Sequence, residues 1–138
     1  MSPRLIVRGI VAACCVGFLA CASQSDQLTV AQARDKLRAG FSRSIHSRDE
    51  RDDASRVMVD AVDHAELERM TFSEVQAAFG LGKVCQANDL CASKGFGGDD
   101  VYYVMGQAAN DKITLLPTLI LGFDPHGHVK RVYTLKTH

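Results

Sequence analysis

The spacing of apolar residues changes along the chain, and this change constrains the fold more than any other feature. Before about residue 80, apolar residues recur every three or four positions, which is the period of an amphipathic helix. This spacing predicts three helices, over Val30–Phe41, Asp49–Glu68 and Phe72–Phe79. Capping boxes that begin at Thr29 and Thr71 precede the first and third helices, and Gly80 is placed to end the third.

The last third of the chain has the period of two that a half-buried strand requires. Three strands are predicted, over Val101–Met105, Ile113–Phe123 and Val129–Leu135. In the middle strand every odd position is apolar, so Leu115 and Leu119 are expected on one buried face. Pro117 lacks a backbone donor and predicts an edge position or a bulge. Leu116 and Ile120 indicate that the opposite face is partly covered too.

The order of these elements predicts an α+β fold. A sheet with an apolar face must be covered, and the N-terminal helices are the cover that the pattern supplies. We therefore expect a two-layer domain over residues 28–138, with N-terminal helices packed on a three-stranded antiparallel β-meander. Leu81–Asp100 is expected to form a loop in which Phe96 folds back over the core, and an exposed Phe96 that serves as a contact residue is the alternative.

The use of cysteine separates the start of the chain from its body. Three of the five cysteines lie within the first 21 residues, and Cys85 and Cys91 remain in the body. Two cysteines in one loop of an exported protein most simply form one disulfide. Because the ring is so small, its constraint on the unfolded chain stabilises the fold by only about 2 kcal/mol. The expected role of the disulfide is therefore to fix a local loop shape.

The first residues of the chain have the features of an export signal. Arg4 and Arg8 precede the uncharged apolar run Gly9–Ala20. This run is shorter than the ~20 apolar residues of a spanning helix, and a short run behind a basic start is typical of a secretory signal. The sequence Phe18-Leu19-Ala20-Cys21 resembles a bacterial lipobox, which is cut before a cysteine that carries lipid. We expect a lipoprotein signal peptide over residues 1–20 and lipidation of Cys21.

Residues 21–27 are then the lipidated cysteine and a polar tether. The six residues after Cys21 reach at most ~20 Å, which would hold the domain beside the membrane surface. Two alternatives to lipidation stay open, namely an ordinary cleaved leader and a remnant transmembrane anchor. The polar residues that begin at Ser23 argue against the anchor.

The charge balance argues against a nucleic-acid partner. Lys plus Arg and Asp plus Glu each number 16, and two arginines leave with the signal, so the mature balance is 14 minus 16, or −2. A protein that binds the phosphate backbone of a nucleic acid is usually strongly basic.

The sequence also lacks the motifs of common catalytic and cofactor sites. His126 and His128 flank a turn, and Cys85 and Cys91 do not have the paired spacing of a structural zinc site, so no metal site is expected. A nucleophile elbow and a glycine-rich phosphate loop are both absent from the sequence, so no cofactor and no enzymatic activity are expected.

An enzyme is the third alternative. A cleft that joined His46 or His64 to an aspartate or a serine would favour it.

Several segments together resemble a known family. Glu68–Gly80 is similar to the G-M-T-x-x-x-V-x-x-x-x-G stretch of the SmpA/OmlA family, also called BamE-like lipoproteins, with Arg69 where the family usually has glycine. Val101-Tyr102-Tyr103 resembles the family's strand with paired aromatics, and Phe123–Val129 resembles its closing F-D-x-x-G-x-V hairpin. The resemblance spans roughly residues 70 to 135.

This resemblance implies a lipid-anchored protein on the periplasmic side of the bacterial outer membrane. The expected function is non-catalytic binding of an envelope or outer-membrane protein, in support of outer-membrane assembly or integrity. The alternative is a β-lactamase-inhibitor-like inhibitory or small-ligand-binding module that uses the sheet face or the Cys85–Cys91 loop. An exposed concave sheet would favour that alternative.

Overall fold

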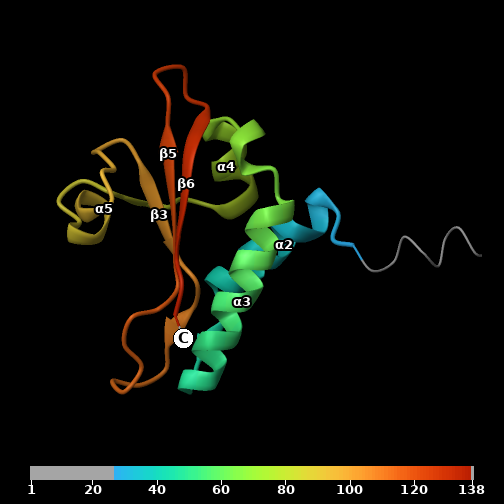
Figure 1. The fold of residues 1–138 in the computed structure, drawn as a ribbon, viewed down its shortest axis with the longest axis vertical. Coiled ribbons are helices and arrows are strands. Elements are labelled where there is room, and N and C mark those ends of the chain that lie inside the picture. The colour runs from blue at the N-terminus through green and yellow to red at the C-terminus, as the bar shows by residue number, and fades with distance from the viewer. Residues whose placement is uncertain (1–26, 138) are drawn as a thin grey trace, which may run out of the picture.

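The computed structural model describes residues 27–137, so the signal peptide, Cys21 and all but the end of the tether lie outside the described residues. The α+β fold class is confirmed, because helices come first and a mainly antiparallel sheet follows (Figure 1). Helices α2 and α3 run side by side along one side of the sheet. Helix α4 lies near the end of the sheet at which β5 turns into β6 (Figure 1).

The helices follow the predicted bounds closely, with one exception. Helices α2 (Val30–Phe41) and α4 (Phe72–Phe79) match the prediction, whereas α3 runs over Arg48–His64 and ends before the predicted Glu68. The helix ends there because Glu66 takes a left-handed conformation, with φ 49°. A 3₁₀ turn, η1 (Leu67–Arg69), follows.

Both predicted capping boxes form. The hydroxyl oxygen of Thr29 accepts a hydrogen bond from the backbone N–H of Gln32 at 3.1 Å, and that of Thr71 accepts one from Glu74 at 3.2 Å. In each case the side chain three residues on accepts a bond in return from the backbone N–H of the threonine. Each cap satisfies helix donors that would otherwise lack partners, and its loss typically costs about 1 kcal/mol.

The main sheet contains four strands in the order β2-β3-β5-β6, and every neighbouring pair is antiparallel. Their bounds are Lys83–Val84, Val101–Val104, Thr118–Phe123 and Val129–Leu135. The predicted three-stranded meander is present as β3-β5-β6, and β2 adds a short fourth strand at one edge. A separate parallel pair joins β1 (Ser44–Ile45) to β4 (Gln107–Ala108).

The start of the central strand differs from the prediction. Strand β5 begins at Thr118 rather than Ile113, and Leu115, which was expected to be buried, is 74% exposed. Leu115 has a φ of 54°, so the chain before β5 is not extended there. Pro117 precedes a central strand instead of lying at an edge or a bulge, and its carbonyl accepts a hydrogen bond from Met105 at 2.7 Å.

The predicted loop from Leu81 to Asp100 contains regular structure and forms a second cover for the sheet. It includes β2 and the short helix α5 (Asp89–Ser93). Ile120 of β5 is fully buried in a cluster with Cys85, Cys91 and Phe96, whereas Leu119 and Leu121 belong to the cluster that includes the helices. The prediction that Phe96 folds back is therefore confirmed, and β5 is covered on both faces.

We predict that Leu119→Ala lowers the free energy of unfolding by about 2–5 kcal/mol, because Leu119 is fully buried and truncation leaves a cavity. Urea denaturation of the purified protein measures this change. The exposed Leu115→Ala is the matched control and should change stability by only a few tenths of a kcal/mol. Equal losses for the two variants would contradict the burial of β5.

Candidate interaction surfaces

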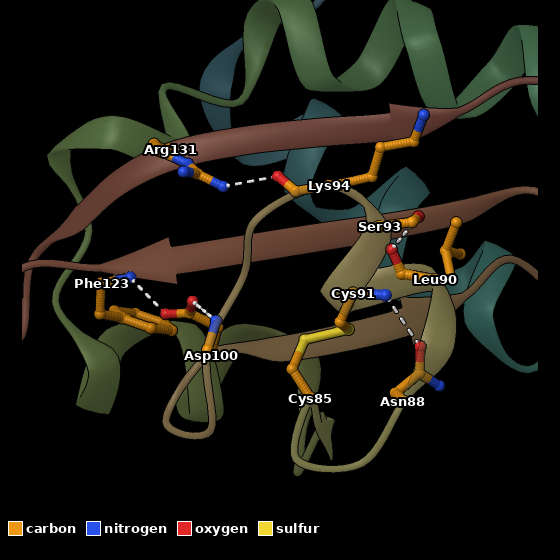
Figure 2. The surroundings of a disulfide bond; sticks show 10 residues. Cys85, Asn88, Leu90, Cys91, Ser93, Lys94, Asp100, Phe123 and Arg131 are labelled. Atoms are coloured by element: carbon orange, nitrogen blue, oxygen red, sulfur yellow. Dashed lines mark hydrogen bonds between the residues drawn. A yellow bond between two sulfur atoms is a disulfide. The ribbon is translucent and has the colours of Figure 1, made fainter.

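The predicted cysteine pair lies at disulfide distance, with the two Cα atoms 5.5 Å apart (Figure 2). Both Cys85 and Cys91 are buried. The side chain of Asn88 accepts a hydrogen bond from the backbone N–H of Cys91 at 3.0 Å and so caps α5. The cysteine link and the cap together hold α5 against the outer face of the sheet, above Ile120.

The far end of this segment is also fixed to the sheet (Figure 2). The carboxylate of Asp100 accepts hydrogen bonds from the backbone N–H groups of Gly97, at 2.8 Å, and Phe123, at 3.0 Å. Arg131 of β6 donates to the carbonyl of Lys94 at 3.1 Å, and its guanidinium lies 4.1 Å from the ring centroid of Phe96. The segment is therefore a structural cover for this face of the sheet.

This cover bears on the alternative of an inhibitory or ligand-binding module. That reading is favoured by an open concave sheet, with Leu116 and Ile120 exposed. Ile120 is fully buried and Leu116 is half-buried. Within residues 27–137 the structure does not supply the open sheet face.

Three histidines of the described residues lie at the surface beside acidic neighbours. Nδ1 of His46 is 3.3 Å from Glu50, that of His64 is 3.8 Å from Asp60, and that of His128 is 3.9 Å from Asp124. Each pair is four residues apart, and all three histidine side chains are exposed. In the part of the chain that the structure describes, no group of three or more His, Cys, Asp or Glu side chains could hold a metal ion.

The shifted pKa values have local causes. The backbone N–H of His46 donates to Glu50 at 2.7 Å and lowers the pKa of that carboxyl. The pKa of Asp124 is lowered mainly by the hydrogen bond from the backbone N–H of His128, and also by that from His126. Burial raises the pKa of Tyr103. The pKa values of Glu50 and Asp124 are lowered chiefly by backbone N–H donors a few residues away, so both carboxylates stabilise local turns of the chain.

Exposed apolar side chains mark a different kind of site. Among residues 27–137, the exposed large apolar side chains are Phe72, Leu81, Val84 and Leu115. Leu81 is 85% exposed and Val84 54% exposed, and both belong to the short segment that enters and forms β2. Single exposed leucines are common, but two in four residues at a sheet edge form a candidate contact.

Leu81 lines a groove with aromatic walls, which we call the aromatic groove. It has a volume of about 320 Å³, and its lining includes Phe41, Phe79, Leu81 and Tyr103. The ring of Tyr103 stacks on Phe41 with centroids 4.9 Å apart and meets Phe79 edge-on at 5.9 Å. The groove therefore joins the end of α2, the end of α4 and the middle of β3.

The shape of the aromatic groove depends on glycine and on one tyrosine hydroxyl. Tyr103 donates a hydrogen bond to the carbonyl of Gly80 at 2.9 Å. A Cβ atom at Gly82 would lie 2.8 Å from Cζ of Tyr103, so only glycine fits there without movement of the ring. Sequence reasoning missed this site, because its walls are aromatic residues that helical or strand spacing assigns to the core.

No protein-family model matches the chain, and no curated protein or solved structure matches it either. Among the described residues, no helix is both long enough and apolar enough to cross a bilayer.

We predict that the double variant Cys85→Ser/Cys91→Ser loses about 2 kcal/mol of stability, because the unfolded chain is no longer constrained by the small ring. Urea denaturation measures the loss, and the wild-type protein under reducing conditions is the control that should match it. Thiol labelling of the unreduced wild type should leave both cysteines unmodified. Efficient labelling of both would mean that they are not bonded in the protein.

Proposed function

We propose that this protein is a non-catalytic lipoprotein, anchored through Cys21 to the bacterial outer membrane on its periplasmic side, that binds another envelope protein. The observation that carries the proposal is the pair of exposed apolar side chains, Leu81 and Val84, of which Leu81 lines the aromatic groove. The lipobox resemblance and the basic, apolar start of the chain support the anchor.

The aromatic groove has the properties of a site for an apolar anchor residue of a partner. Its aromatic walls are held by ring contacts and by the Tyr103 hydrogen bond, so little side-chain freedom is lost on binding. Transfer of one exposed leucine from water to an apolar interface is worth about 1.5–3 kcal/mol. Contacts of this kind, around buried aromatic and aliphatic anchors, dominate many protein interfaces.

The family resemblance supports the same proposal. Its two most characteristic segments, the one that begins α4 and the closing hairpin, lie against each other. The backbone N–H of Phe72 donates to the carbonyl of Gly127 at 2.7 Å, and that of Val129 donates to Met70 at 3.0 Å. A role in outer-membrane assembly or integrity, as in SmpA/OmlA proteins, is the form of envelope binding that we propose.

We predict that Leu81→Asp reduces capture of the partner from solubilised envelopes at least about tenfold, because a buried carboxylate at the contact costs more than the lost apolar area. Quantitative mass spectrometry of the proteins captured by the full mature chain measures this effect. Circular dichroism should show that the variant is folded, because the side chain of Leu81 is exposed and contributes little to the core.

The matched control is Leu115→Asp, which makes the same change at an exposed leucine away from the aromatic groove. It should capture the partner as the wild type does. The proposal fails if both variants retain the same captured proteins in wild-type amounts, or if the wild type captures no envelope protein.

A further inference from the structure

A hollow lies between helices α2 and α3, toward the C-terminal end of α2, and we call it the interhelical pocket. It has a volume of about 290 Å³. Two of the residues that line it, Lys36 and Arg43, are basic, and none is acidic. The rest of the lining is apolar and consists of Ala39, Gly40, Ala54, Val57 and Met105. An apolar hollow with a few convergent polar groups has the composition of a small-molecule site.

The pocket has a buried floor and an exposed mouth. Gly40 and Ala54 are buried, and Met105 is 1% exposed, so these residues form the floor. A Cβ atom at Gly40 would collide with Sδ and Cε of Met105, so the thioether packs directly on the backbone of α2. Ala39 and Lys36 are exposed and lie at the mouth. The floor is therefore an apolar surface that includes a flexible, polarisable side chain, which adapts readily to an apolar ligand.

The walls of the interhelical pocket offer few free backbone groups. Most of them belong to α2 and α3, whose backbone groups are bonded within each helix. At the end of α2, the carbonyl of Gly40 accepts from the N–H of Arg43 at 3.2 Å, and that of Ala39 accepts from the hydroxyl of Ser42 at 3.3 Å. An extended peptide, which is recognised through its main chain, therefore fits poorly. An acyl chain needs only apolar contact and fits well.

The mouth of the pocket carries positive charge. Lys36 makes no ion pair within residues 27–137, and its neighbour Asp35 does not line the pocket. Arg43 meets Asp53 through Nη1 at 3.0 Å, and the same carboxylate meets Arg56 at 3.7 Å. One acid is thus shared by two guanidinium groups, and the other N–H groups of Arg43 can still donate.

We propose that the interhelical pocket binds a free fatty acid of medium length. Its acyl chain packs against Ala39, Val57 and Met105, and its carboxylate lies between Lys36 and Arg43. The volume is at the lower end of the range for ligand sites, which suits one short chain rather than a whole phospholipid.

This site is separate from the aromatic groove, because the two linings share no residue. The inference does not depend on the proposed function, since neither the lipid on Cys21 nor an envelope partner takes part in it.

The test titrates decanoate, below its micelle concentration, into the mature chain from residue 21 onward, produced without lipid so that no detergent competes. Calorimetry should show saturable binding of one molecule per chain. Octanoate should bind about tenfold more weakly, because it buries two fewer methylene groups. Decyltrimethylammonium has the same tail and the opposite charge, and should bind much more weakly because it meets Lys36 and Arg43.

The methionine methyl groups locate the ligand directly. Met105 lines the pocket, whereas Met58 and Met70 are buried elsewhere in the core and serve as internal controls. In a protein with isotope-labelled methionine, decanoate should shift the methyl resonance of Met105 and leave the other two nearly unchanged.

Two variants test the mouth of the pocket. Lys36→Glu should weaken decanoate binding about three- to tenfold, because an attractive charge becomes repulsive. Ala39→Leu should weaken it at least about tenfold, because the larger side chain takes the space of the acyl chain. The matched controls are Arg38→Glu and Ala31→Leu, which make the same changes at exposed positions of α2 outside the pocket.

If Ala39→Leu does not fold, Lys36→Glu and the Met105 resonance test the same site. The proposal is overturned if decanoate does not bind, if decyltrimethylammonium binds equally well, or if decanoate binds without shifting the Met105 resonance. It is also overturned if Lys36→Glu and Arg38→Glu have equal effects, or if sedimentation shows that a second copy of the chain covers the pocket and decanoate leaves that dimer intact.

Discussion

Burial of β5 on both faces is the constraint on which the rest of this structure depends. Leu119 and Leu121 pack toward the helices, and Ile120 packs under the Cys85–Cys91 segment, with all three fully buried. Each such side chain contributes about 1.5–3 kcal/mol relative to an exposed position. Because both faces of the central strand are covered, the aromatic groove lies toward the β2 edge of the sheet rather than on an open face.

The sequence predicted the elements whose determinants are local. The capping boxes at Thr29 and Thr71 fix two helix starts within four residues, and Gly80 ends the second of these helices with a φ of 82°. The cysteine pair followed from its spacing and from expected export. The predicted start of β5 was wrong, because the apolar pattern continues back through Leu115. The left-handed backbone conformation of Leu115 cannot be read from the spacing of apolar residues.

The remaining features depend on contacts between distant residues. Strand β2 has two residues and forms because β3 pairs with it, so no local pattern could distinguish it from a loop. The aromatic groove brings together Phe41, Phe79 and Tyr103, which the sequence placed in two separate helices and a strand.

We propose that a small folded module binds its partners while a lipid on Cys21 holds it at the membrane. Intact mass spectrometry of the mature protein, isolated from envelopes, tests this claim most directly. The account predicts that the chain begins at Cys21 and carries the added mass of a lipid. A mature chain that begins at another residue, or at Cys21 without added mass, would contradict it.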